Sequence, residues 1–302
     1  MAEHASSGDT SLDRRFQWGQ GSLEAGDAET AAELFASVTE GAPGWPAGWY
    51  HLGLARKKLG HGEPAAEALA RYLALDPADR LGAGVLLVAL GAGDRQNAMS
   101  AAYVTALFDD YAPRFDAHLT EKLRYSGPQA LMAALEKLGL PFRFARALDL
   151  GCGTGLMARA LEGAAETLIG VDLSQRMLDE ARKIGLYAEL HQGDVVAFLD
   201  DQPQPADLIL AADVLVYIGD LDPLLGAAAR KLSPGGLFAF TVQGRAGEGF
   251  ALGEDARYAH SEAYLRATAS AAGLRIALLE PVSTRMDRGV PVPGLVLVLE
   301  PA

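Results

Sequence analysis

The residues best suited to chemistry lie in a glycine-rich segment near the middle of the chain. Residues 148–155 read LDLGCGTG, so Gly151, Gly153 and Gly155 follow directly after an apolar run. Glycine permits backbone angles that other residues avoid, and it lets a ligand approach the main chain closely. The dinucleotide-binding fingerprint needs its third glycine or alanine at position 156, where this chain has Leu156. The spacing therefore predicts a ligand-binding turn and argues against a nicotinamide or flavin enzyme.

Acidic residues recur beside the apolar runs in this half of the chain. Asp149 precedes the glycine-rich turn, and Asp172, Asp194 and Asp213 follow or close later runs. Ligands bind beyond the carboxyl ends of parallel strands, so these carboxylates are candidate binding groups. Structural alternatives exist: the glycines could be ordinary turn residues, and Asp194 could be a surface turn residue. Asp172 is less suited to cap the next helix, because Ser174 is available for that position.

Alternating strands and helices must position these residues. Buried strands are expected over 146–150, 167–172, 187–192, 206–212 and 237–242, with helices between them. This alternation predicts a parallel sheet with helices on both faces. After a helix over 261–271, the strands 274–279 and 295–299 are joined by a loop alone, so they are expected to pair antiparallel. The expected fold class is α/β, a mostly parallel sheet of seven strands with an antiparallel C-terminal hairpin.

Local signals mark several boundaries of these elements. Ser174 is expected to cap a helix that runs to residue 184, and Ser261 a helix that runs to residue 271. Asp222 is expected to cap another helix, because Pro223 suits its first turn. Residues 233–236 read SPGG and predict a turn before the fifth strand.

Five segments in this half, taken in order, resemble the motifs of class I S-adenosylmethionine-dependent methyltransferases. They are residues 148–155, Asp172, residues 192–195 (QGDV), Asp213 and residues 231–236 (KLSPGG). Each is weak alone, but their joint order and spacing across 129–302 are specific. The resemblance implies the Rossmann-like methyltransferase fold and S-adenosylmethionine as the cofactor. The whole chain resembles the predicted bacterial methyltransferases that carry N-terminal tetratricopeptide repeats.

The resemblance also implies how the cofactor would be held. Asp172 would accept hydrogen bonds from the ribose hydroxyls, Asp194 from the adenine amino group, and the Val195 amide would reach an adenine ring nitrogen. Asp213 would lie near the methionine moiety, and Cys152 is expected only to fill space. The expected cofactor-binding residues are Tyr111, Asp149, Gly151, Gly153, Gly155, Asp172, Leu173, Met177, Asp194, Val195 and Asp213.

Candidate catalytic residues follow the fourth and fifth expected strands. Tyr217 stands where many relatives carry a histidine, and His260 precedes the helix over 261–271. Packing is the alternative for Tyr217, and a solvent-exposed position is the alternative for His260. Arg257 is a candidate substrate contact. Tyr111 and Phe115 resemble an aromatic arm that folds over the cofactor, where a ring face near a sulfonium gives a cation–π contact; core packing is the alternative for Phe115.

The first third of the chain repeats itself with a shift of 34 residues. The matching pairs are Gly19 and Gly53, Gly26 and Gly60, Ala31 and Ala65, Phe35 and Leu69, and Pro43 and Pro77. They resemble the tetratricopeptide repeat, which has this period, and residues 80–90 predict one further capping helix. We expect a helical module over 12–95, a linker and an N-terminal arm over 96–128, and the methyltransferase domain over 129–302.

Composition limits the possible partners. The chain has 302 residues and a formal net charge of -13, which disfavours nucleic acids and anionic membranes. Its single cysteine permits no intrachain disulfide and fits a reducing compartment. The N-terminal residues 1–15 are polar, and no apolar run approaches the roughly 20 residues of a membrane span. We expect a cytoplasmic protein that binds neither nucleic acid nor membrane.

Two functions remain open at this point. The first is transfer of a methyl group from S-adenosylmethionine to an O, N or C atom of a small-molecule or carrier-bound acceptor, by in-line displacement. The second is a non-catalytic partner-binding or assembly protein that retains a cofactor-binding fold. The repeat module could bind a protein partner, brace the catalytic domain or mediate dimerisation. The chain contains no recognisable metal-binding or hydrolase motif, so no metal is expected.

Overall fold

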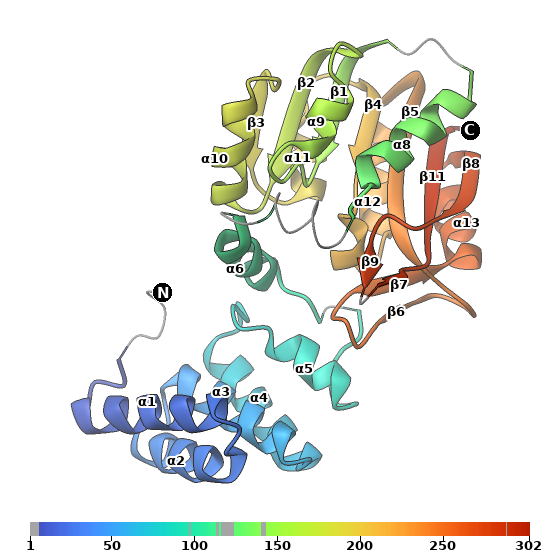
Figure 1. Ribbon diagram of the computed structural model, residues 1–302. Coiled ribbons are helices and arrows are strands. Elements are labelled where there is room, and N and C mark those ends of the chain that lie inside the picture. Colours follow the sequence, from blue (N-terminus) through green and yellow to red (C-terminus); the bar gives the residue numbers. More distant parts are fainter. Residues whose placement is uncertain (1–5, 97, 113–114, 116–123, 140–142, 288) are drawn as a thin grey trace. The chain divides into compact units, whose positions relative to one another are not determined.

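The computed structural model describes residues 6–96, 98–112, 115, 124–139, 143–287 and 289–302. The chain divides into two compact units, Met1–Tyr103 and Val104–Ala302, and each is considered separately (Figure 1). Asn97 of the expected linker, and Pro113, Arg114 and His118 of the expected arm, lie outside the described residues. The expected bounds of the module, the arm and the catalytic domain stay predictions.

The first unit is a row of packed helices. They are α1 (Thr10–Glu24), α2 (Ala28–Gly41), α3 (Pro46–Lys58), α4 (Gly62–Leu75) and α5 (Ala83–Ala89), and each packs against the next along the chain. Two aspartates fix the first helix starts, because Asp9 accepts hydrogen bonds from the amides of residues 11 and 12, and Asp27 from that of Thr30. The buried core of the unit includes Phe16, Phe35, Leu52, Leu69 and Tyr72.

The two helix pairs have the same internal geometry at positions 34 residues apart. A Cβ atom added to Gly19 would lie 2.7 Å from the Phe35 ring, and one added to Gly53 would lie 2.7 Å from Leu69. The glycines thus allow the second helix of each pair to approach the first closely. Gly26 and Gly60 turn the chain between the helices with φ angles of +88° and +77°, where other residues would be strained.

The second unit is built on one large sheet. Its main path runs β3-β2-β1-β4-β5-β11-β8. The strands are β1 (Phe144–Leu150), β2 (Ala165–Asp172), β3 (Glu189–Gln192), β4 (Ala206–Ala211), β5 (Leu232–Arg245), β8 (Leu274–Val282) and β11 (Gly294–Pro301). The first five are mutually parallel, whereas β11 is antiparallel to both β5 and β8. The predicted parallel sheet with an antiparallel hairpin is confirmed.

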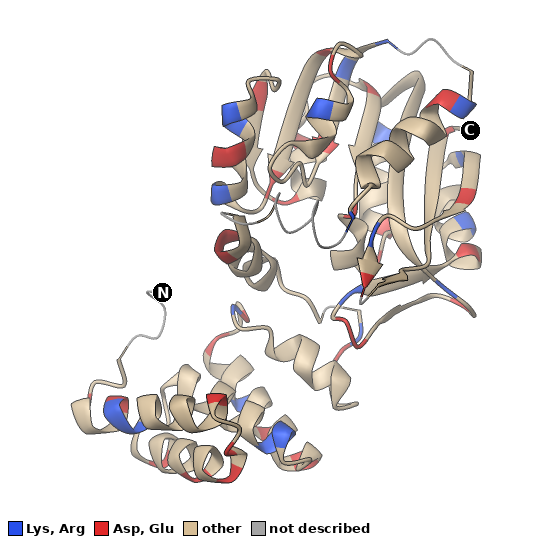
Figure 2. Cartoon of the chain, in the orientation of Figure 1, with Lys and Arg blue, Asp and Glu red and all other residues tan. Residues whose placement is uncertain are grey.

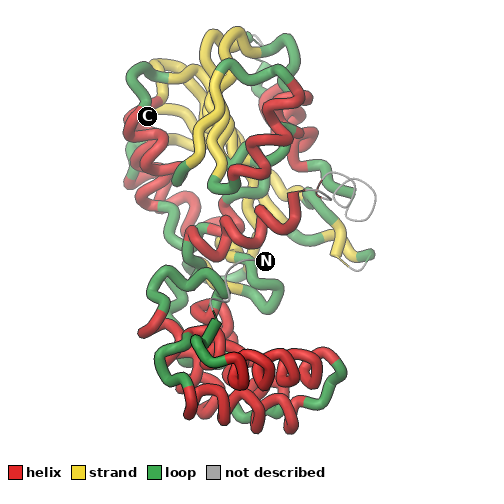
Figure 3. The backbone as a smooth tube through the Cα atoms, turned by 90° about the vertical axis from the view of Figure 1, so that its left-hand side faces the viewer, coloured by secondary structure: helices red, strands yellow, loops and turns green. Residues whose placement is uncertain are grey.

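Helices cover both faces of this sheet, as Figure 3 shows. They are α8 (Gly127–Lys137), α9 (Leu156–Ala160), α10 (Gln175–Ile184), α11 (Val195–Asp201), α12 (Asp222–Lys231) and α13 (Glu262–Ala271). Alternate residues of β4 enter opposite cores: Leu208 and Leu210 pack with Leu131 of α8, and Ile209 packs with Leu225 of α12. The alternation of side chains along a strand therefore gives one core on each face.

Several expected boundaries were wrong. Two short strands were missed: β7 (Tyr258–Ser261) pairs with the end of β5, and β6 (Phe250–Leu252) pairs with β7. Strands this short carry too little alternation to be detected in a sequence. The expected turn at 233–236 lies within β5, and the cap of α12 is Leu221, with Asp222 as the first helical residue.

Smaller elements complete the second unit. A two-stranded ribbon is formed by β9 (Met286–Asp287) and β10 (Val290–Pro291), and a single turn η3 (Leu215–Tyr217) follows β4. Helix α6 (Ala101–Tyr111) spans the boundary of the two units, and the Ser100 hydroxyl accepts a hydrogen bond from the Tyr103 amide at its start. Among the described helices, none combines the length and the apolar character that a membrane crossing requires.

Candidate active site

The glycine-rich turn joins β1 to α9 at the carboxyl end of the sheet. Gly151, Gly153 and Gly155 all have left-handed backbone angles, with φ of +61°, +54° and +90°. A Cβ atom on Gly151 would lie 2.5 Å from the Val214 side chain, and one on Gly155 would lie 2.6 Å from Ile184. Larger residues are therefore excluded both by strain and by contact. Among the described residues, only Phe115 lies within 4 Å of a Cβ atom added at Gly153, at 3.9 Å, so this part of the loop is less crowded.

Asp172 at the end of β2 is bonded directly to this turn. Its carboxylate accepts a hydrogen bond from the Gly153 amide at 2.9 Å and another from the Ser174 amide at 2.8 Å. Burial raises the pKa of Asp172 above its usual value, although both amide bonds oppose the shift. Ser174, and not Asp172, caps α10 by accepting a bond from the Met177 amide. The two neighbouring predicted residues differ in exposure, because Leu173 is half-buried and Met177 is buried.

Asp149 lies beneath the turn and is 1% exposed. Its carboxyl accepts a hydrogen bond from the Tyr187 hydroxyl at 2.6 Å. Burial is the main cause that raises its pKa to about 7, and the nearby Asp172 charge acts in the same direction. Burial also raises the pKa of the Cys152 thiol well above its usual value, so Cys152 is a poor thiolate nucleophile.

The turn between β3 and α11 carries the next predicted pair. Asp194 is exposed and caps α11, because one carboxylate oxygen accepts bonds from the Val196 and Ala197 amides at 2.9 and 3.1 Å. Val195 is buried at the first position of the helix. Asp194 therefore has a structural role in the fold, and its other carboxylate oxygen accepts neither of these bonds.

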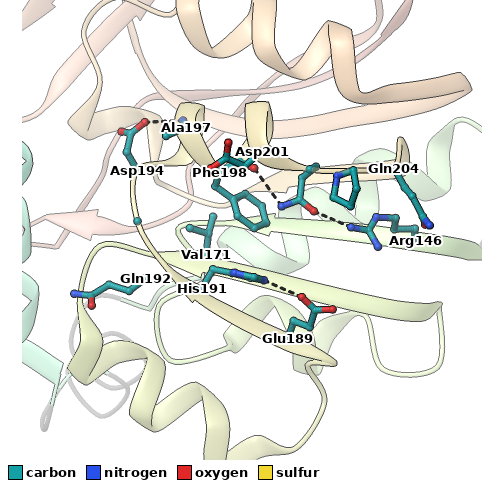
Figure 4. Close-up of a pocket in the computed structure, with 13 residues that line it drawn as sticks. Arg146, Val171, Glu189, His191, Gln192, Asp194, Ala197, Phe198, Asp201 and Gln204 are labelled. Carbon is teal, nitrogen blue, oxygen red and sulfur yellow. Dashed lines mark hydrogen bonds and ion pairs between the residues drawn. The ribbon is translucent and has the colours of Figure 1, made fainter.

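A cavity of about 500 Å³ lies between β3 and α11. Figure 4 shows Gln192 and Asp194 at one end of it and Arg146 and Gln204 at the other. Arg146 donates a hydrogen bond to the Gln202 side chain at 2.7 Å within this cavity. None of the glycines of the β1–α9 turn lines it. The cavity therefore reaches the predicted site only at Asp194.

Asp213 follows β4 in a conformation rare for its residue type. Its φ angle is +56°, in the left-handed region that strains most non-glycine residues. The backbone is fixed there because the Asp213 amide donates to the Thr241 hydroxyl at 2.9 Å. The carboxylate accepts bonds from the Thr241 and Thr284 hydroxyls at 2.7 and 2.8 Å. Neither threonine was predicted, because both are far from Asp213 in the sequence: Thr241 lies in β5 and Thr284 in the loop after β8.

Aromatic residues surround Tyr217 in the turn after β4. The Phe108 ring of α6 meets the Tyr217 ring edge to face, with centroids 5.2 Å apart. Phe115 contacts both Tyr111, at 5.2 Å, and Phe108, at 6.0 Å. The aromatic residues of the expected arm thus lie beside the glycine-rich turn and the turn after β4. Tyr125, which had no predicted function, also lies near Asp213, Asp149 and Tyr217, and burial raises its pKa well above the usual value.

The end of α6 is attached next to Asp172. Asp109 accepts a hydrogen bond from the Ser174 hydroxyl at 2.5 Å, and its main-chain carbonyl accepts one from Arg176 at 3.1 Å. Ser174 therefore joins α6 to α10 in addition to capping α10. Asp109 could not be predicted, because the contact joins residues that are far apart in the chain.

His260 is fully buried in β7, which excludes the alternative of a solvent-exposed histidine. Its Nε2 atom lies 2.9 Å from the Gly219 carbonyl, two residues beyond Tyr217. The ring stacks on Tyr264, with centroids 5.7 Å apart. Burial lowers its pKa to about 4, so the imidazole is neutral at pH 7. His260 therefore supports the segment after η3 through its contact with the Gly219 carbonyl. The catalytic roles of His260 and Tyr217 stay predictions.

Known proteins resemble part of this chain in sequence. Residues 147–236 match a family model described as a methyltransferase domain. The chain is 32% identical over 104 residues to a ubiquinone biosynthesis O-methyltransferase of Methylococcus capsulatus, covering 33% of this chain and 44% of that protein. It is 33% identical over 139 residues to a malonyl-[acyl-carrier protein] O-methyltransferase of Enterobacter lignolyticus, covering 46% and 53%. The chain thus spans about half the length of the curated relatives it matches.

A solved structure resembles this chain over about two thirds of its length. The magnesium protoporphyrin IX methyltransferase of Synechocystis PCC 6803 with bound SAH has a TM-score of 0.51 and 17% sequence identity. The match covers 67% of this chain and 99% of that one. The second unit therefore has the Rossmann-like methyltransferase fold. The family model and the solved structure thus agree on a methyltransferase-like domain in this part of the chain.

Proposed function

We propose that the second unit binds S-adenosylmethionine and transfers its methyl group to an O, N or C atom of a small-molecule or carrier-bound acceptor. The observation that carries the proposal is the bond between the Gly153 amide and Asp172. It fixes an accessible glycine turn and an acidic residue side by side at the ends of β1 and β2. Asp149 and Asp213 lie at the ends of β1 and β4 on the same edge of the sheet.

This set of groups fits the proposed cofactor. Gly151 and Gly153 are half-buried, so part of the main chain of the turn is accessible, and Asp172 offers carboxylate oxygens that accept hydroxyl donors. Asp149 and Asp213 would provide acceptor groups close to the positively charged part of the ligand. The expected contacts of Tyr111, Leu173, Met177, Asp194 and Val195 remain part of the proposal.

When bound, the cofactor would supply an activated methyl group, and the chain would supply alignment. An in-line displacement depends strongly on the orientation of the two reactants. Tyr217 is fixed by Phe108 and by the rigid turn that begins at Asp213, so its hydroxyl is suited to orient an acceptor. For His260 we favour a positioning role, because it contacts the Gly219 carbonyl that follows this turn.

The test is calorimetric titration with S-adenosylhomocysteine, the demethylated product. We expect Asp172→Ala to weaken binding at least a hundredfold while the protein stays folded, with a lower melting temperature because the Gly153 and Ser174 amides lose their acceptor. Asp172→Asn should keep the shape of the side chain but weaken S-adenosylhomocysteine binding. One of the two accepting carboxylate oxygens becomes an NH2 group, which cannot accept a hydrogen bond. The control is Asp179→Asn on the exposed face of α10, where acidic and basic residues alternate (Figure 2). Unchanged affinity in Asp172→Ala would contradict the proposal.

Methyl transfer itself separates the two functions that the sequence left open. A product should form from labelled S-adenosylmethionine with a pool of small-molecule or carrier-bound acceptors. Cofactor binding without transfer to any acceptor would favour a non-catalytic protein that retains the fold.

We further propose that the first unit is a tetratricopeptide-repeat module that binds a protein partner, and that the protein is cytoplasmic. Support for the module comes from the matching contacts of Gly19 with Phe35 and of Gly53 with Leu69, together with Ala31, which is fully buried. Pull-down with the intact chain and with a Trp18→Ala variant tests the partner, because Trp18 is 62% exposed on α1. A partner retained equally by both forms would exclude Trp18 from its binding surface.

A further inference from the structure

Two arginines lie close to the turn after β4, and one of them is already paired. Arg285, which follows β8, donates a hydrogen bond to the Gln243 side chain at 2.9 Å. It also forms an ion pair with Asp255 at 3.4 Å, and its side chain is only 10% exposed. Arg285 therefore has both a neutral acceptor and a carboxylate partner within the fold.

The second arginine, Arg257, has no such carboxylate. It lies between β6 and β7, half-buried, with its guanidinium 6.0 Å from the centroid of the Tyr217 ring. Within the described part of the chain, no acidic group lies at ion-pair distance from it. Of the neighbouring groups, Tyr217, which shares a side-chain hydrogen bond with it, acts most strongly on the Arg257 guanidinium, followed by Asp255 and Asp213. Asp255 is paired with Arg285, and Asp213 accepts bonds from two threonine hydroxyls.

The backbone holds Arg257 in place. The Arg257 carbonyl accepts a hydrogen bond from the Gly253 amide at 2.8 Å, and the Ala256 amide donates to the Gly253 carbonyl at 3.1 Å. Ala256 has a φ angle of +54°, an uncommon conformation for this residue type. These bonds fix the backbone of Arg257, and the contact with the Tyr217 ring restricts its guanidinium, so less entropy is lost when it binds an anion.

We propose that Arg257 binds a carboxylate of the methyl acceptor, so that the substrate class is small molecules carrying this group. This inference rests on the proposed function. The guanidinium lies against Tyr217, beside Asp213, at the expected position of methyl transfer. Its planar array of N–H donors matches a carboxylate with two parallel hydrogen bonds. An acceptor anchored in this way would present a neighbouring atom to the methyl group.

The charges around Arg257 favour an anionic acceptor over a cationic one. Arg285 neutralises Asp255, and the proposed sulfonium would add a positive charge near Asp213. With both of those carboxylates offset, the positive charge of Arg257 itself stays uncompensated, so it would attract an anion and repel an amine. Attraction between opposite charges is stronger in partly buried positions than in bulk water.

The experiment measures the affinity of benzoate and of its neutral analogue benzamide, by ligand-observed NMR with saturating S-adenosylhomocysteine. We expect the wild type to bind benzoate at least tenfold more tightly than benzamide. Arg257→Gln should remove this preference and leave S-adenosylhomocysteine affinity within twofold of the wild type. Arg257→Lys should keep only part of the preference for benzoate, because a lysine cannot form the bidentate pair. Arg266→Gln is the control, since Arg266 pairs with Glu262 on the exposed side of α13.

Three results would overturn the inference. One is equal affinity for benzoate and benzamide in the wild type, and another is an unchanged preference in Arg257→Gln. The third is a parallel loss of S-adenosylhomocysteine affinity in Arg257→Gln, which would assign Arg257 to the cofactor instead. If the wild type binds S-adenosylhomocysteine but not benzoate, only this inference fails. If it does not bind S-adenosylhomocysteine, the proposed function fails and this inference with it.

Discussion

Asp149 shows how a single buried carboxyl can link the glycine-rich turn to solution pH. It lies beneath the turn, accepts a bond from Tyr187 and has its pKa raised to about 7, mainly by burial. The folded state therefore retains a proton between about pH 4 and pH 7 that the unfolded chain has released. The stabilising effect of this proton is complete at the acidic end of the window and is lost as the pH rises towards 7.

Replacing this carboxyl should change the pH dependence of stability. Asp149→Asn keeps an acceptor for Tyr187 but removes the titration. We expect the variant to gain stability relative to the wild type as the pH rises from 4 to 7, with a difference that levels off above that range. The shift of about 3 pKa units sets an upper limit of about 4 kcal/mol.

Urea unfolding at pH 5, 6, 7 and 8 measures this difference directly. Asp179→Asn on the surface of α10 is the matched control, and its effect should stay nearly constant over the same range. A difference between Asp149→Asn and the wild type that does not vary with pH would exclude the proton linkage.

At the residue scale, the sequence predicted the groups that follow each strand but not their partners. The positions of Gly151, Gly153 and Asp172 could be inferred because the turn chemistry is local. Thr284 could not be inferred, because it meets Asp213 only after β8 and β11 have paired across the sheet. The burial of His260 could not be inferred either, because it depends on the short strand β7, which the sequence pattern does not predict.

At the scale of elements, Ser174 joins two helices. Its hydroxyl accepts a bond from the Met177 amide as the cap of α10 and donates one to Asp109 at the end of α6. Ser261 caps α13 in a similar way, accepting a bond from the Tyr264 amide. The two serines are both buried, so they form a natural pair for comparison.

We expect Ser174→Ala to destabilise the second unit more than Ser261→Ala. Loss of a helix cap costs about 1 kcal/mol, and Ser174→Ala also removes the bond to Asp109. A double-mutant cycle of Ser174→Ala with Asp109→Asn, followed by thermal unfolding, should give a coupling of about 0.5–1.5 kcal/mol. Additive effects in that cycle would show that the two side chains do not act together.

Most helices and strands could be predicted because their apolar periods and caps are contained in short windows. The exact ends were less predictable: β5 extends from Leu232 to Arg245 because Leu232 pairs with Ala206 of β4 and the last residues of β5 pair with β7. The same tertiary pairing created β6 and β7, whose residues alone show no strand pattern. Sequence periodicity therefore defines an element, and its neighbours set its length.

At the scale of the whole molecule, the two units have separate cores, so damage to one should leave the other intact. Gly19→Ala would place a methyl group about 2.7 Å from the Phe35 ring. We expect it to destabilise the first unit by about 1–3 kcal/mol through overpacking. The affinity for S-adenosylhomocysteine should not change, because the predicted binding residues belong to the second unit.

Gly21→Ala provides the control in the same helix. No atom lies within 4 Å of a Cβ at that position, so the substitution should stabilise the helix by up to about 1 kcal/mol. Thermal unfolding and calorimetry of both variants separate the two effects. A loss of cofactor affinity in Gly19→Ala would indicate that the units are energetically coupled.

The position of β11 constrains how the sheet can form during protein synthesis. The ribosome makes β5 and β8 first, yet neither of these strands pairs with the other, because β11 lies between them. Until residues 294–301 emerge, both strands keep unpaired backbone edges next to apolar side chains. Such edges invite pairing with other chains. A nascent chain stalled before residue 294 would therefore be a target for chaperones. Once β11 has emerged, it would pair with β5 and β8 and complete the sheet between them.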